Sequence, residues 1–248
     1  MVGRAPTLLT LVAGLALYDT FHASLWNASS DWWDVAFLAF VLIPASFAVV
    51  WLLLPLRRAP GLLPVAIALG VLTWAFHVAG WNTPENLTKL FAITFAGFWF
   101  LHYFETAAWV VVVALIIPWV DAYSVWRGPT KVIVTQHPDV FTSLSYALPI
   151  PGVDAGANLG VPDVLFFALF LAAAARFGLR RGLTWWALTA SLGITITITV
   201  WAQRAGLPAL PGLALGFLVP NADLLWKRVR QEGWSLQAPT SDAGQRQP

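Results

Sequence analysis

Residues 106–126 read TAAWVVVVALIIPWVDAYSVW, and residues 162–178 read PDVLFFALFLAAAARFG. Both runs are apolar enough to lie in a membrane, and each carries one acidic residue, Asp121 in the first and Asp163 in the second. A carboxylate in hydrocarbon costs roughly 2.5–3.5 kcal/mol on insertion scales, so it usually marks a functional site or a buried partner. Two carboxylates on two helices that pack together provide the chemistry of an aspartyl pair that shares one proton.

The composition places the chain among membrane proteins. Of its 248 residues, 58% are hydrophobic and 10% are charged, and the mean hydropathy is +0.71, whereas a soluble domain has about 25% charged residues. Many of the 15 tryptophans lie near the ends of apolar runs, as expected at a membrane–water interface. The absence of cysteine excludes disulfides, and a net charge of +2 gives no indication of nucleic-acid binding.

The apolar runs predict an all-α, polytopic transmembrane helical bundle. A helix needs roughly 20 residues to cross a bilayer. Residues 1–105 supply the N-terminal membrane helices, residues 106–226 form a second unit that contains both aspartates and the polar loop 127–161, and residues 227–248 form a disordered polar tail. The fourth and fifth runs are so close that they form either one bent helix or a tight hairpin. The predicted membrane segments are approximately 7–26, 35–56, 62–80, 87–104, 106–126, 162–178, 183–203 and 207–225.

The polar loop separates the two aspartates in the sequence. Its β-branched run Lys131-Val132-Ile133-Val134-Thr135 predicts a short strand. The prolines and glycines between Pro149 and Gly160 predict a flexible chain segment just before Asp163.

The distribution of basic residues predicts a topology. With eight crossings and a cytoplasmic N-terminus, ten basic residues lie on the cytoplasmic side and four on the opposite side. The positive-inside rule therefore favours two cytoplasmic termini, and we expect the protein in the plasma membrane of a prokaryote.

Each aspartate also has a simple structural interpretation. Asp121 lies near the end of its run, where an interfacial carboxylate is tolerated, and Asp163 lies where a helix begins, a position at which aspartate is a favoured cap. The order of the surrounding motifs favours a catalytic interpretation instead. Asp121-x-x-Ser124-Val125 is followed by a polar loop, by Gly160-x-x-Asp163 at a helix start, and finally by Pro208-Ala209-Leu210-Pro211.

This order resembles the presenilin and signal peptide peptidase family of GxGD-type intramembrane aspartyl proteases, over about residues 119–223. The resemblance implies that the chain is a bacterial or archaeal presenilin-like protein that hydrolyses peptide bonds within the transmembrane helices of substrate proteins, without a metal or cofactor. It also implies that Asp121 and Asp163 are the catalytic pair. The substrate-binding positions implied by the resemblance are Gly160, Val161, Pro162, Pro208, Ala209 and Leu210.

The chain departs from the family pattern at three points. Val120 replaces the tyrosine that precedes the first catalytic aspartate, and Pro162 replaces the second glycine of the Gly-x-Gly-Asp motif, where it fixes φ near −65° and removes an N–H. The family usually has nine membrane helices, so one N-terminal helix is missing or merged among the eight predicted here. The orientation predicted from charge is similar to that of signal peptide peptidase.

Two other functions fit parts of the sequence. An ion- or proton-coupled transporter or channel would use Asp19, Asp121 and Asp163, with a broken helix at Pro208. A membrane haem, metal or lipid-modifying enzyme would use the single histidines of three predicted helices. We favour simple packing contacts for these residues and for the neighbouring pair Asp19 and His22. The three histidines are His22, His77 and His102.

Overall fold

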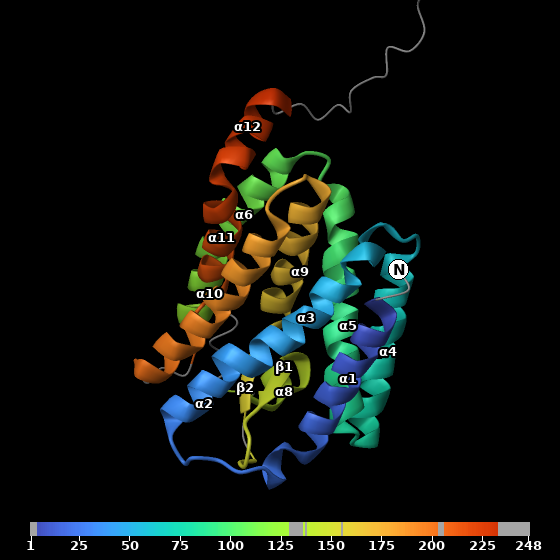
Figure 1. The fold of residues 1–248 in the computed structure, drawn as a ribbon, viewed down its shortest axis with the longest axis vertical. Coiled ribbons are helices and arrows are strands. Elements are labelled where there is room, and N and C mark those ends of the chain that lie inside the picture. Colours follow the sequence, from blue (N-terminus) through green and yellow to red (C-terminus); the bar gives the residue numbers. More distant parts are fainter. Residues whose placement is uncertain (1–3, 129–135, 137, 155, 203–205, 233–248) are drawn as a thin grey trace, which may run out of the picture.

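A computed structural model describes residues 4–128, 136, 138–154, 156–202 and 206–232. The predicted strand Lys131–Thr135 and most of the predicted polar tail lie outside these ranges. Within them the protein is a bundle of long helices with one short β-hairpin at one end (Figure 1). Four helical segments are long and apolar enough to cross a membrane: Asp31–Arg58, Leu62–Ala79, Ala107–Trp126 and Arg181–Trp201.

The long helices coincide closely with the predicted apolar runs. The fourth and fifth runs form two separate helices rather than one bent helix, because η4 and an extended residue, Thr106, lie between them. The predicted last run contains two helices, and the second of these extends to Glu232, so the predicted tail from residue 227 begins too early. The helical elements are α1 (Arg4–Phe21), η1 (His22–Ser24), α2 (Asp31–Phe37), η2 (Leu38–Leu42), α3 (Ile43–Leu53), η3 (Leu54–Arg58), α4 (Leu62–Ala79), α5 (Asn82–Phe100), η4 (Leu101–Tyr103), α6 (Ala107–Trp126), α8 (Pro138–Leu144), α9 (Val161–Arg176), α10 (Arg181–Trp201), α11 (Leu210–Leu218), η5 (Val219–Asn221) and α12 (Ala222–Glu232).

Helix α9 is the centre of the bundle. Its side chains from Phe166 to Ala174 are all buried, as expected for a helix that is apolar on every face and surrounded by other helices. The ring of Phe167 stacks on Phe47 of α3 with centroids 4.0 Å apart, and the ring of Phe170 stacks on Phe217 of α11 at 4.9 Å. Helix α9, which begins beside Asp163, is therefore held by its neighbours along most of its length.

A glycine brings α5 very close to α9. A Cβ atom at Gly97 would lie 2.7 Å from the carbonyl oxygen of Leu165 and 3.0 Å from the Cβ of Ala168. Small residues at helix contacts allow such close backbone approach inside membranes, where association depends on packing rather than on the exclusion of water.

We expect Gly97→Ala to destabilise the protein by about 1–3 kcal/mol, since the extra methyl group forces the two helices apart. Gly70 of α4 provides the matched control, because a Cβ there meets no atom within 4 Å. Gly70→Ala should be neutral or stabilise by up to about 1 kcal/mol through helix propensity. Thermal unfolding in detergent measures both, and equal unfolding temperatures for the two variants would contradict a tight α5–α9 contact.

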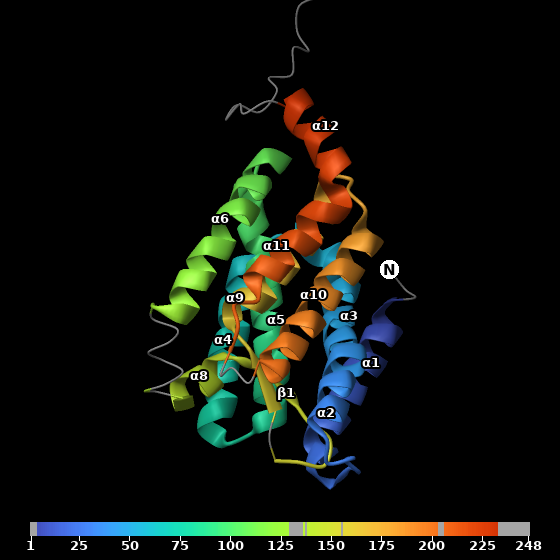
Figure 2. The ribbon, with the colours of Figure 1, turned by 90° about the vertical axis from the view of Figure 1, so that its left-hand side faces the viewer.

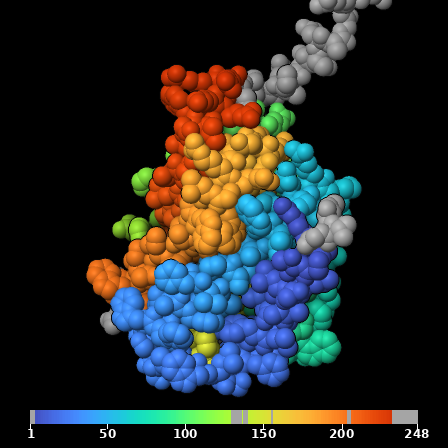
Figure 3. All heavy atoms as spheres, in the orientation of Figure 1, coloured from blue at the N-terminus to red at the C-terminus, as the bar shows by residue number. Residues whose placement is uncertain are grey.

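The β-hairpin consists of β1 (Tyr146–Pro149) and β2 (Gly156–Leu159), paired antiparallel with Tyr146 opposite Leu159 and Pro149 opposite Gly156. On the face shown in Figure 3, its yellow atoms are visible only through a small opening between the blue N-terminal helices. Residues 156–159 of the predicted loop therefore form a strand, and the flexibility of the loop stays a prediction.

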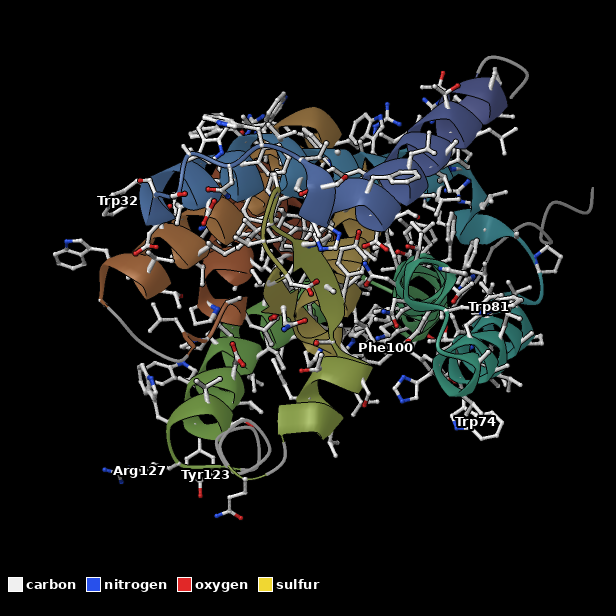
Figure 4. All side chains as sticks on the ribbon, turned by 90° about the horizontal axis from the view of Figure 1, so that it is seen from below. Trp32, Trp74, Trp81, Phe100, Tyr123 and Arg127 are labelled. Carbon is white, nitrogen blue, oxygen red and sulfur yellow. The ribbon has the colours of Figure 1, made fainter. Side chains whose placement is uncertain are left out.

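Exposed tryptophans surround the end of the bundle that carries the hairpin. Trp32, Trp74 and Trp81 point outward from α2, from α4 and from the α4–α5 turn when the molecule is viewed from below (Figure 4). Such amphipathic rings favour the headgroup level of a bilayer.

Candidate active site

Asp121 lies in the last two turns of α6, and its carboxylate reaches α11. Its Oδ2 accepts a hydrogen bond of 3.0 Å from the backbone N–H of Leu210, 89 residues further along the chain. Leu210 is the first residue of α11, where backbone N–H groups lack partners within the helix and the helix dipole favours a negative charge. The structure thus joins the first aspartate directly to the Pro208-Ala209-Leu210 segment.

Asp163 is the third residue of α9 and bonds back to the residue that precedes the helix. Its Oδ2 accepts from the Gly160 N–H at 3.0 Å, and the Gly160 carbonyl accepts from the N–H of Asp163 at 3.1 Å. Asp163 therefore does contribute to capping, but from the third helical position rather than from the cap itself. No hydrogen bond from the described part of the chain reaches its second oxygen.

The two carboxyl groups lie near enough to interact through their charges, since Asp121 acts electrostatically on Asp163. The framework for this proximity is α11, which packs against both α6 and α9 (Figure 2). Both aspartates are half-buried. Neighbouring carboxyl groups that are shielded from water do not both ionise readily.

The local structure around Asp163 accounts for the residue types at Gly160 and Pro162. A Cβ at Gly160 would lie 3.3 Å from Oδ2 of Asp163, so a side chain at this position would crowd the carboxylate. Pro162 is the second residue of α9, where the missing N–H costs no helical hydrogen bond and the fixed φ suits the helix. A proline at this position is therefore compatible with the local backbone.

The β-hairpin is attached to the helices by specific hydrogen bonds. The Asn86 side chain both donates to the Ala147 carbonyl (2.9 Å) and accepts from the Ala147 N–H (2.8 Å). The Tyr18 hydroxyl donates to the Pro149 carbonyl at 2.6 Å, and the hydroxyls of Tyr146 and Ser46 lie 2.9 Å apart. Burial raises the pKa of Tyr146 to about 12, so its hydroxyl remains protonated at neutral pH. Since Gly160 directly follows β2, these bonds also fix the position of the chain just before Asp163.

Asn86→Ala should release β1 from α5. The substitution leaves the N–H and carbonyl of Ala147 without their partners, which costs about 1–3 kcal/mol for buried groups. We expect faster hydrogen exchange over residues 146–159, measured by mass spectrometry. Thr88→Ala, on the same helix, removes only bonds to α4 and to its own helix, so exchange in the hairpin should not change. Unchanged exchange in Asn86→Ala would contradict this role.

The remaining candidate residues are engaged elsewhere. Nδ1 of His22 lies 2.7 Å from the Asp19 carbonyl, and Nδ1 of His102 lies 3.1 Å from the Trp99 carbonyl, each within its own segment. His77 pairs with Glu85 at 3.2 Å. Within the described ranges, no three histidine, aspartate or glutamate side chains are grouped so that they could hold a metal ion.

Two polar features of the site region were not identified from the sequence. The first is Asn86, and the second is a buried ion pair in which Nζ of Lys89 lies 3.0 Å from Oε1 of Glu85 and also donates to the Ser145 carbonyl at 3.0 Å. The i, i+4 spacing of Glu85 and Lys89, at the start of the predicted run 87–104, was the available signal.

Comparison with known proteins provides no further constraint, because the chain matches no protein-family model, no curated protein and no solved structure. The geometry around the two aspartates is therefore the evidence on which a function can be proposed.

Proposed function

We propose that the protein is a presenilin-like intramembrane aspartyl protease that hydrolyses peptide bonds within transmembrane segments of substrate proteins. The observation that supports this most strongly is the hydrogen bond between the Asp121 carboxylate and the Leu210 N–H. It connects the first aspartate to the Pro-Ala-Leu segment while the second aspartate lies within electrostatic range. The motifs are far apart in the sequence and belong to three different helices.

In the proposed mechanism the aspartates share one proton. The ionised carboxylate removes a proton from a water molecule, whose oxygen attacks the scissile carbonyl carbon, and the protonated carboxylic acid donates its proton to the carbonyl oxygen. Collapse of the resulting tetrahedral centre breaks the C–N bond. The carboxylic acid formed in the first step gives its proton to the leaving amine, while the other, now ionised, carboxylate takes a proton from a hydroxyl of the tetrahedral centre as the C=O bond re-forms. The pair thereby regains its starting protonation state.

A substrate helix must unwind before its peptide bonds are accessible, and its backbone groups then need new partners. We propose that β2 supplies them by accepting the substrate as an added strand. Asn86 binds both the N–H and the carbonyl of Ala147, so these two groups point away from β2. Ala147 lies opposite Asn158, and the two residues therefore form a non-hydrogen-bonded pair of the antiparallel ladder. The backbone groups of Asn158 therefore point away from β1, two residues before Gly160.

We further propose eight membrane crossings, with both termini on the cytoplasmic side of a prokaryotic plasma membrane. The hairpin and α8 lie at the bottom of Figure 1, and the α9–α10 connection and α12 lie at the top. The top carries the larger share of the basic residues, which favours a cytoplasmic location for it. The proposed crossings are α1, Asp31–Arg58, α4, α5, α6, α9, α10 and α11 with α12.

The test is cleavage of a reporter transmembrane peptide by the purified protein in liposomes, with product masses measured over time. We expect two complementary fragments whose junction lies inside the apolar segment of the reporter. If no fragments form from a panel of reporters, and the same liposomes instead carry a proton or ion flux that depends on the protein, the transporter is the better description.

A further inference from the structure

A cavity of about 330 Å³ lies at the end of α9 opposite to Asp163, and its polar lining is entirely basic. It is lined by Arg57 and Arg58 at the end of η3, by Leu101 and His102 of η4, and by Arg176 at the end of α9. The three arginines thus come from two segments that are separated by more than 100 residues and are brought together only by the fold.

Backbone carbonyls hold two of these guanidinium groups in place. Arg57 donates to the carbonyls of Leu54 (3.0 Å) and Ala175 (3.4 Å), and Arg176 donates to the carbonyl of Leu101 (2.8 Å). These bonds use only part of the donor capacity of a guanidinium group, which has five N–H bonds. The Nε of Arg57 is buried and has no hydrogen-bond partner among the described residues.

The positive charge of the cavity is only partly offset by the surrounding protein. Arg58 repels both Arg57 and Arg176, and Arg181 adds to the repulsion on Arg57. Glu105 is the one carboxylate that acts on Arg176, and no ion pair joins any of the three arginines to an acidic side chain in the described ranges. Such a cluster is unfavourable unless an anion binds to it.

We propose that this cavity binds the phosphate group of an anionic phospholipid. Planar guanidinium groups match phosphate oxygens with paired hydrogen bonds, and basic pockets between membrane helices are suited to lipid headgroups. The cavity lies where the segment Asp31–Arg58 and helix α9 end, so acyl chains can lie along the bundle while the headgroup enters the cavity. The bound phosphate would join the ends of η3, η4 and α9.

The proposal is tested on the full-length protein in a neutral detergent, with lipid retention measured by native mass spectrometry and unfolding temperature measured in parallel. Phosphatidylglycerol, phosphatidylcholine and inorganic phosphate are the three probes. We expect phosphatidylglycerol to be retained and to raise the unfolding temperature, and the other two probes to have little effect.

Arg58→Gln is the most informative variant, because Arg58 makes no hydrogen bond within the described structure and its loss should leave the fold intact. We expect Arg58→Gln and Arg176→Gln each to weaken phosphatidylglycerol binding by about tenfold or more. Lys227→Gln removes an exposed charge at the same end of the bundle but outside the cavity, so it should bind as the wild type does.

Two outcomes would overturn the proposal. Equal retention of phosphatidylglycerol by the wild type and Arg58→Gln would show that the cavity is not the binding site. Protection by inorganic phosphate that matches or exceeds that of the lipid would identify a site for free phosphate instead of a lipid site.

Discussion

Asp121→Asn and Asp163→Asn are each expected to reduce cleavage of a transmembrane reporter by about 10³-fold or more, because the proposed mechanism needs one carboxylate as base and one carboxylic acid as proton donor. Asparagine has nearly the same shape as aspartate but does not exchange a proton at neutral pH. Its side-chain oxygen can still accept the hydrogen bond that Leu210 donates to residue 121, or that Gly160 donates to residue 163. The fold should therefore survive both substitutions, and the unfolding temperature should stay near that of the wild type.

Asp19→Asn is the matched control. Asp19 is a third carboxylate in a predicted membrane run, and its side chain accepts a hydrogen bond of 3.4 Å from Asn86. A protease with an Asp121/Asp163 pair should retain most of its activity in the Asp19→Asn variant. A transporter that uses all three carboxylates should instead lose flux in each of the three asparagine variants. Cleavage that persists in both Asp121→Asn and Asp163→Asn would exclude the proposed catalytic pair.

Lys89→Met is expected to destabilise the protein by about 3–5 kcal/mol, since removal of one partner from a buried ion pair leaves the other charge uncompensated. Lys89 and Glu85 are 7% and 8% exposed. In the variant, Glu85 would keep only His77 as a partner, and the Ser145 carbonyl beside the hairpin would lose its donor. We expect a lower midpoint of chemical unfolding in detergent.

The double variant Glu85→Gln/Lys89→Met separates the cost of an unpaired charge from the value of the pair. With no charge left to bury, its stability should return to within about 1–2 kcal/mol of the wild type, the remaining loss coming from the Ser145 carbonyl. If the double variant is as unstable as Lys89→Met, the destabilisation does not arise from an unpaired Glu85 carboxylate.

The helices were predictable because the sequence signal for them is local. An apolar run of about 20 residues forms a helix in a membrane whatever its neighbours are, so the observed bounds of α4, α6 and α10 differ from the predicted ones by one or two residues. The hairpin was missed for the opposite reason. Tyr146–Pro149 is short and contains a proline, and its partners Asn86 and Tyr18 are more than 60 residues away in the sequence.

The candidate site was predictable only in part. The resemblance of the motifs singled out Asp121, Asp163 and the Pro-Ala-Leu segment, but the contact between Asp121 and Leu210 depends on how α11 packs against α6, which no local pattern contains. The basic cavity was likewise hidden, because Arg57, Arg58 and Arg176 individually look like topology anchors at helix ends.

The proposed function requires that Asp121 and Asp163 act together on one tetrahedral centre. Binding of a reporter peptide that carries a secondary alcohol in place of the scissile carbonyl tests this claim without requiring turnover, because such an analogue resembles the transition state. We predict that the wild type binds the analogue at least about 10²-fold more tightly than the unmodified peptide, and that either asparagine variant loses this advantage. Equal affinity of the analogue for the wild type and both variants would contradict the account.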